Sequence, residues 1–315
     1  MLLLLALLAC GPSTFDEAQR FPEVQALLRA GALNSTPELS LRDRGFGPEL
    51  ARALAETPGS GLVHSLDLRG NLIGPSGAQA LADAEVLRGL TSLNLGPGRV
   101  YPDGNRVGDG GARAIAASET LASLESLDLT LNHIGAEGAL MLAASGEGLR
   151  ALVLDSNPIG ETGAVALGRA PNLGPLDTLQ LGWCEVGPEG AAALASSPAL
   201  RGAGTLLLSY NPLGDAGARA LAAGQLSGLH KLYLNNAEIG DSGIEALAGS
   251  TALDTVTHLN LDGNPFGDAG AQALAASPHL GSLQWLSLRN TQMSEAGRAA
   301  LDAVAKTRGF TIEDS

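Results

Sequence analysis

The chain has 315 residues, of which 45% are hydrophobic and only 3% aromatic, so its core must consist of leucine, alanine, valine and isoleucine. The formal net charge of −14 argues against nucleic-acid binding, which needs a basic patch, and against polybasic attachment to a membrane surface. The two cysteines, Cys10 and Cys184, give no disulfide framework.

Residues 1–10 form a short apolar run that ends at Cys10 and is typical of a secretory signal, because it is too short to span a bilayer. The segment Leu7-Leu8-Ala9-Cys10 resembles a bacterial lipobox, although no basic residue precedes the run. The resemblance implies cleavage before Cys10 and lipidation of that residue, with two or three acyl chains as a stable membrane anchor. An ordinary cleaved signal and a start codon further upstream remain alternatives.

This N-terminus predicts a location in the cell envelope. Gly11 follows the cysteine, so the lipobox resemblance favours the outer membrane if the cell has two membranes. Without lipid the protein would be secreted. Residues 11–35 are predicted to be a short linker and an N-terminal capping helix, because apolar residues lie at helical spacing before Gly31 (Phe21, Val24, Leu27 and Leu28).

One pattern, L-x-L-x-x-N-x-(I/L/V/F)-G-x-x-G-A-x-A-L-A, recurs from residue 39 onward. Its Asn position, called the Asn slot below, falls at residues 44, 71, 105, 132, 157, 184, 211, 237, 264 and 291. Most steps are 27 residues; the step from 71 to 105 contains an insertion of about seven. This periodicity predicts a leucine-rich-repeat solenoid of about ten units over residues 36–305 and a C-terminal cap over 306–315.

Each unit is predicted to be a strand followed by a helix. Alternating leucines form a short strand with one buried face. Proline at the first helical position (Pro48, Pro75, Pro188) or an acidic residue in the same slot (Asp109, Glu161, Asp215, Asp241, Asp268) suits a helix N-terminus. Helices are bulkier than strands. We therefore expect an α/β fold that is a curved right-handed horseshoe, with parallel strands on the concave face and helices on the convex face.

The asparagines of the repeat are predicted to point inward and to bond otherwise unpaired backbone of the turns, since buried polar groups need partners. This structural ladder comprises Asn71, Asn105, Asn132, Asn157, Asn211 and Asn264. Cys184 occupies the same slot and is interpreted as a small buried thiol.

The 27-residue unit with a full helix resembles the ribonuclease-inhibitor-like class of leucine-rich repeats over residues 39 to about 305. The resemblance implies protein–protein binding on the concave face, although a fold alone does not fix a function. Cys184 lies where that class often places cysteine.

Motifs that suggest catalysis have simpler explanations. Gly240-Asp241-Ser242-Gly243 matches the nucleophile motif of trypsin-like proteases, yet Gly-Asp-Ala-Gly fills the same slot at 214–217 and 267–270. No Gly-Lys-(Ser/Thr) follows the G-x-x-G runs, and no two histidines have the i, i+4 spacing of a metal-binding helix. We therefore predict no catalytic residue, no cofactor and no metal.

The rare aromatic residues indicate a binding surface. The chain has two Trp and three Tyr, and four of these five residues fall on the predicted concave face or its rim. Trp and Tyr are frequent interface anchors. The alternative is that they only cover neighbouring strands. Arg99 and Tyr101 lie in the insertion Gly96–Gly104, which either contacts a ligand or is a tolerated surface loop. The predicted concave ligand-binding residues are Trp183, Leu207, Tyr210, Tyr233, Asn235, His258, Trp285 and Arg289.

The favoured hypothesis is a monomeric, non-enzymatic scaffold of the bacterial cell envelope that binds a protein partner and meets the membrane only through its lipid. One alternative is a GTPase-activating protein of the Ran type, which shares this repeat class and would need a cytosolic location. Another is a secreted, effector-like repeat protein.

Overall fold

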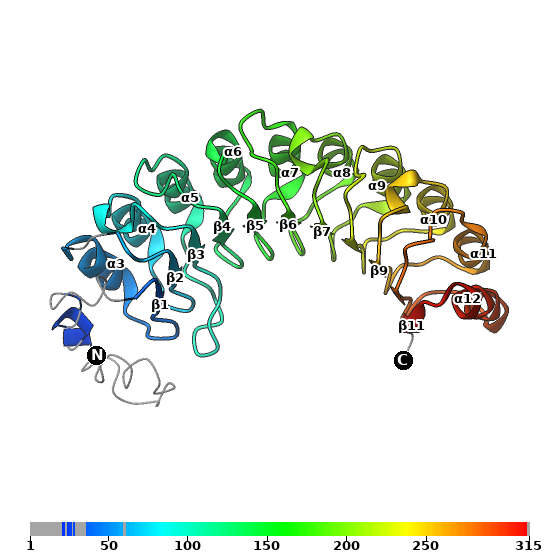
Figure 1. The fold of residues 1–315 in the computed structure, drawn as a ribbon, viewed down its shortest axis with the longest axis horizontal. Helices are drawn as coiled ribbons and strands as arrows, with labels where there is room; N and C mark the ends of the chain where they lie inside the picture. Colours follow the sequence, from blue (N-terminus) through cyan, green and yellow to red (C-terminus); the bar gives the residue numbers. More distant parts are fainter. Residues whose placement is uncertain (1–20, 23, 27, 29–35, 59–60, 314–315) are drawn as a thin grey trace. The chain divides into compact units, whose positions relative to one another are not determined.

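A computed structural model describes residues 21–22, 24–26, 28, 36–58 and 61–313 (Figure 1). The predicted lipobox, with Cys10, lies outside the described residues, as do Leu27 and Gly31 of the predicted N-terminal cap. The described part of that cap is helical, and the ring of Phe21 packs on Phe46 of the first repeat with a centroid distance of 5.2 Å. The chain divides after Asn157 into two compact units, called unit 1 and unit 2.

Unit 1 alternates strands and helices. Its strands pair in parallel in sequence order, with the central leucines in register from Leu39 through Leu66, Leu93 and Leu127 to Leu152. The elements are β1 (Glu38–Ser40), α3 (Gly47–Ala55), β2 (Ser65–Asp67), α4 (Gly74–Ala82), the 3₁₀ helix η2 (Glu85–Leu87), β3 (Ser92–Asn94), α5 (Gly108–Ala116), β4 (Ser126–Asp128), α6 (Ala136–Ser145) and β5 (Ala151–Val153).

Unit 2 has the same plan, and its strands β6 to β11 also pair in parallel in sequence order. The elements are α7 (Gly160–Arg169), β6 (Thr178–Gln180), α8 (Pro188–Ala195), η3 (Pro198–Leu200), β7 (Thr205–Leu207), α9 (Gly214–Ala222), β8 (Lys231–Tyr233), α10 (Asp241–Ala248), η4 (Thr251–Leu253), β9 (His258–Asn260), α11 (Asp268–Ala276), β10 (Trp285–Ser287), α12 (Glu295–Arg308) and β11 (Thr311–Glu313).

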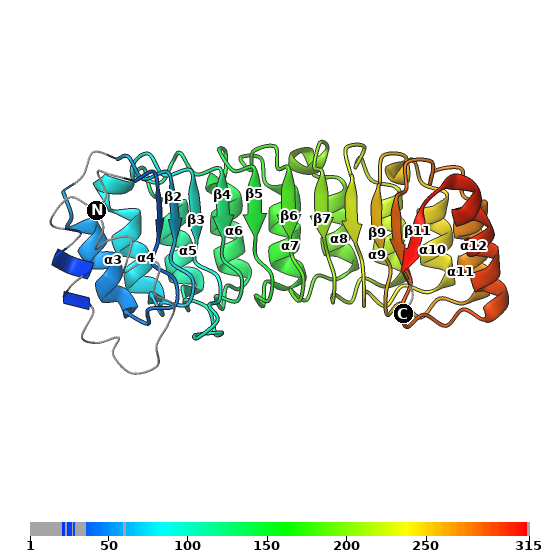
Figure 2. The same ribbon diagram turned by 60° about the horizontal axis from the view of Figure 1, so that its bottom comes forward.

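Within each unit the strands form one layer and the helices the other (Figures 1 and 2). The core lies between the layers and consists of the middle leucine of each strand together with the alanines and leucines of the inner helix faces. This arrangement confirms the predicted α/β solenoid of strand–helix repeats. Among the described residues, no helix is long and apolar enough to cross a membrane.

Buried asparagines join neighbouring repeats. The Asn211 amide nitrogen donates to the carbonyls of Leu181 (2.7 Å) and Leu208 (3.0 Å). Its Oδ1 accepts from the main-chain nitrogens of Cys184 (3.0 Å) and Val186 (2.9 Å). One side chain thereby supplies partners to four buried backbone groups, which would otherwise be costly to bury. Bonds between neighbouring repeats also come from Asn71, Asn105, Asn132, Asn157 and Asn264.

The acidic residues in the first turns of the helices also accept hydrogen bonds from main-chain nitrogens at the start of the next helix along the chain. Asp215 in α9 accepts through Oδ1 from the main-chain nitrogens of Gly240 (2.7 Å) and Gly243 (3.1 Å), which begin α10. It also accepts from the Ser242 hydroxyl at 2.6 Å. The Ser242 bond contributes most to a lowered pKa of Asp215, while burial opposes this shift. Asp109, Asp241 and Asp268 cap the following helix in the same way.

The residue type in this aspartate slot correlates with the φ angle of the glycine that precedes the next helix. Gly240, bonded by Asp215, has an extended φ of −91°. Gly214 follows a repeat with Pro188 in the slot, and its φ is +58°, in the left-handed region that favours glycine. A carboxylate thus selects one of two local conformations at each helix start.

Candidate protein-binding surface

The side of each sheet that points away from the helices is called the strand face. In each repeat it carries the first and third strand residues and the residue two positions before the Asn slot. The position just before the Asn slot is called the rim slot. In unit 2 the rim slots hold Trp183, Tyr210, Asn236, Gly263 and Asn290.

Trp183 and Tyr210 form a stacked pair in adjacent rim slots. Their ring centroids are 4.1 Å apart and the rings are inclined by 12°. The two residues are 60% and 40% exposed and are among the few exposed large hydrophobic residues that the structure describes. The pair therefore presents a large aromatic surface to solvent.

The rim slot is an unfavourable position for bulky residues. Both Trp183 and Tyr210 have a φ of +57°, which costs a residue with a side chain about 1 kcal/mol. Glycine or asparagine fills the other rim slots of unit 2, and these types tolerate this region better. Stacking of the two rings contributes about 0.5–1.5 kcal/mol, which does not exceed the combined backbone cost of the two residues. Packing alone therefore does not explain two exposed aromatics at this position.

A second aromatic group on the strand face of unit 2 is less exposed. The ring of Trp285 lies 6.5 Å from that of Tyr233 and 6.0 Å from that of His258. The indole N–H of Trp285 donates to Glu313 Oε2 at 3.1 Å, so strand β11 already satisfies its polar atom. For Trp285, the alternative that the ring covers neighbouring strands fits the structure better than a free anchor.

Arg289 is also engaged within the molecule. Its guanidinium forms an ion pair with Glu313, and its main-chain nitrogen donates to Asp262 Oδ1 at 2.7 Å. Asn235 is half-buried and accepts a hydrogen bond from the Ser209 hydroxyl. Leu207 is also half-buried and pairs with Tyr233 on the neighbouring strand. The structure thus divides the predicted surface into an exposed pair, Trp183 and Tyr210, and residues that mainly hold the sheet together.

The insertion packs on the first repeat of unit 1. Tyr101 lies so close to Gly45 that a Cβ there would be 2.5 Å from its phenolic oxygen. The main-chain nitrogen of Val100 donates to Asp43 Oδ1 at 3.1 Å. Tyr101 is therefore half-buried in an internal contact, whereas Arg99 beside it is exposed. The sequence offered two interpretations of the insertion, ligand contact or surface loop. Tyr101 fits neither, because it has a structural role in packing against the first repeat.

The strand face of unit 1 is polar. Asp67 binds the Arg69 guanidinium at 2.8 and 3.0 Å, and Asn94 donates to Asp128 Oδ2 at 3.0 Å. Partial burial would raise the pKa of Asp67, but the hydrogen bonds and charge of Arg69 outweigh it and hold the pKa below the usual value. Within the described residues, no group of three His, Cys, Asp or Glu side chains is arranged to hold a metal ion.

Two sequence motifs have structural roles. The Ser242 hydroxyl donates to Asp215 and accepts from Arg219 Nη1 at 3.1 Å, so it belongs to the capping network at the start of α10. Cys184 is buried in the Asn slot, and its thiol donates to the Gly182 carbonyl.

Comparison with known proteins agrees with this architecture. A family model described as a leucine-rich repeat matches residues 62–82, 120–143, 149–168, 175–195, 205–222, 228–248 and 253–275. The chain is therefore built of leucine-rich repeats, and its fold is a leucine-rich-repeat solenoid. Proteins of this kind are in general non-enzymatic interaction scaffolds. Among curated proteins, no sequence matches this chain.

Several solved structures resemble this chain at low sequence identity and low TM-score. The LRR ectodomain of the Arabidopsis receptor kinase HAESA, solved with an IDA peptide hormone, gives a TM-score of 0.43 at 16% identity, covering 70% of this chain and 37% of that chain. The present chain thus spans little more than a third of it. A chain of the yeast Rad7–Elc1 complex gives 0.44 at 17%, covering 98% and 90%. A Leptospira interrogans LRR protein gives 0.38 at 16%, covering 85% and 75%. These likenesses concern the fold alone.

Proposed function

We propose that this protein is a non-enzymatic scaffold that binds a protein partner through the strand face of unit 2 and its rim, with Trp183 and Tyr210, both in rim slots, as the anchors. The observation that carries the proposal is an exposed aromatic stack at two positions of positive φ. Trp and Tyr dominate the binding energy of many interfaces because they bury large areas at little entropic cost. Lys231 on the same face is exposed and adds a charge for orientation.

Replacing both anchors with asparagine is expected to abolish partner capture and leave the fold intact. Truncating one such anchor costs about 2 kcal/mol or more, so the double variant Trp183→Asn, Tyr210→Asn should bind at least about 30-fold more weakly. Asparagine fills the rim slot in two other repeats, as Asn236 and Asn290, so the backbone at positions 183 and 210 should accept it. The measurement is capture of partners by the two immobilised proteins, followed by affinity measurement with each purified partner.

Leu131→Asn is the matched control, because Leu131 fills a rim slot of unit 1 at a φ of +54°. This variant should keep wild-type affinity. All proteins must first show similar thermal melting. A partner retained equally by the double variant and the wild type would disprove the anchor role of the pair.

We further propose that the protein works at the bacterial cell envelope, held there by lipid on Cys10. The support is the segment Leu7-Leu8-Ala9-Cys10 and its resemblance to a lipobox. Growth with an alkyne-tagged fatty acid should label the wild type and not Cys10→Ala. Cys184→Ala is the matched control, because its thiol is buried, and it should be labelled normally. Label that persists in Cys10→Ala would refute the lipid anchor.

A further inference from the structure

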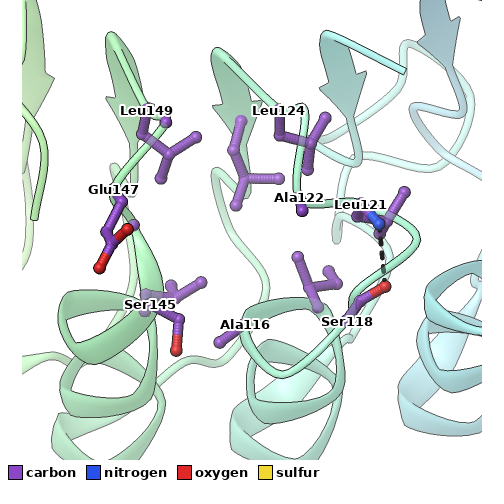
Figure 3. Close-up of a pocket in the computed structure, with 13 residues that line it drawn as sticks. Ala116, Ser118, Leu121, Ala122, Leu124, Ser145, Glu147 and Leu149 are labelled. Atoms are coloured by element: carbon purple, nitrogen blue, oxygen red, sulfur yellow. Dashed lines mark hydrogen bonds between the residues drawn. The ribbon is translucent and has the colours of Figure 1, made fainter. Parts of the chain in front are cut away.

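A pocket of about 320 Å³ opens in unit 1, between helices α5 and α6 and the loops that lead into β4 and β5 (Figure 3). Apolar side chains form much of its wall, including Leu121, Leu124 and Leu149. Ser145 and Glu147 line it from the end of α6 and the loop that follows. The pocket opens to solvent at a place in the repeat where most other repeats place a buried leucine.

The pocket is present because one repeat lacks this leucine. Five residues before strands β3, β4 and β6 to β10 the chain has a buried leucine that fills the space between the helix end and the sheet. These residues are Leu87, Leu121, Leu173, Leu200, Leu226, Leu253 and Leu280. Before β5 the same position is Gly146. This repeat is also shorter, because its Asn slots lie at 132 and 157, a step of 25 instead of 27.

The pocket also carries a carboxylate. Glu147 lines it, is exposed, and makes no hydrogen bond or ion pair with any residue in the described part of the chain. The pocket therefore combines a wall that accepts a branched aliphatic group with an acidic group that favours a cation. The net charge of −14 further favours a basic partner.

We infer that this pocket is a docking site for a partner polypeptide that inserts one leucine-like side chain in place of the leucine missing at Gly146, with a neighbouring Arg or Lys paired to Glu147. The occupant takes the place that a leucine of the chain itself holds in seven other repeats. The site lies wholly within unit 1 and does not depend on Trp183 or Tyr210, so it stands or falls separately from the function proposed above.

The test uses the full chain and two probe peptides, Gly-Arg-Leu-Arg-Gly and Gly-Arg-Ser-Arg-Gly, titrated while the protein methyl groups are followed by NMR. The leucine peptide should shift the methyl signals of Leu121, Leu124 and Leu149 and bind at least ten-fold more tightly than the serine peptide. Gly146→Leu should abolish this preference and raise the melting temperature, because the chain then fills its own pocket. Glu147→Gln should weaken the leucine peptide several-fold without affecting folding, since the residue is exposed.

Gly281→Leu is the matched control. It adds the same side chain at an exposed loop glycine of unit 2, where a Cβ would meet nothing within 4 Å. This variant should bind both peptides as the wild type does. Equal affinity of the wild type for the two peptides would overturn the inference, as would an unchanged leucine preference in both Gly146→Leu and Glu147→Gln.

Discussion

Asn105→Ala is expected to lower the free energy of unfolding by about 4 kcal/mol. The Oδ1 of Asn105 accepts from the main-chain nitrogens of Asn71 (3.2 Å) and Ile73 (3.1 Å). Its amide nitrogen donates to the carbonyls of Leu68 (3.0 Å) and Leu95 (2.8 Å). The side chain is fully buried, so alanine leaves the main-chain nitrogens of Asn71 and Ile73 without a partner or water to replace it. The two carbonyls keep one bond each, because Leu68 also accepts from the Asn71 amide and Leu95 from the Asn132 amide. Each buried group left unpaired costs about 1–3 kcal/mol.

Asn71→Ala is the matched comparison and should cost only about 2 kcal/mol. Asn71 is equally buried and donates to the carbonyls of Leu41 (2.8 Å) and Leu68 (3.0 Å). Its Oδ1, however, has no hydrogen-bond partner among the described residues, because it belongs to the first full step of the ladder. Urea unfolding of the two variants measures the difference. Equal losses would show that accepting from the turn nitrogens contributes nothing to stability.

The periodic part of the molecule was predictable from sequence because the same pattern recurs in every repeat, so each recurrence supports the same assignment. A leucine at a fixed spacing is ambiguous once, but ten recurrences fix the phase of strand, turn and helix. The same phase placed Trp183 and Tyr210 in consecutive rim slots, where the structure finds them stacked. Glycine, asparagine or aspartate in other rim slots is compatible with positive φ, but leucine and serine fill the same position in unit 1, so the sequence alone did not establish this backbone conformation.

The contacts that break the period were not predictable. Tyr101 packs on Gly45 across more than fifty residues, and only the folded insertion brings the two together. Trp285 and Arg289 both reach Glu313, which lies beyond the last full repeat. The aspartate slot was recognised, but one sequence does not show that a carboxylate reaches the following helix as well as its own.

The pocket at Gly146 differs from these cases, because its signals were present in the sequence. The step from 132 to 157 is two residues short, and glycine stands where seven other repeats have leucine. A shortened repeat is usually interpreted as a tolerated deletion in a surface loop. Only the arrangement of the surrounding leucines shows that the deletion removed a core side chain.

Gly168→Ala is expected to cost about 3 kcal/mol, at the upper end of what an added methyl group does in a packed core. A Cβ at Gly168 in α7 would lie 2.4 Å from the carbonyl carbon of Ala193 and 2.6 Å from the nitrogen of Leu194, both in α8. These are backbone atoms, so no rotamer change relieves the overlap and the two helices must move apart.

Gly240→Ala is the matched control for this substitution, because its φ is extended and its Cβ would find only an ordinary contact of 3.4 Å with Asp215 Oδ1. We expect a change within about 0.5 kcal/mol, since alanine also restricts the unfolded chain. Thermal and urea unfolding of the two proteins measure the contrast. If Gly168→Ala melts like Gly240→Ala, then α7 and α8 are not packed backbone to backbone. In that case the glycine of the helix α7 serves the repeat in another way than close approach to its neighbour.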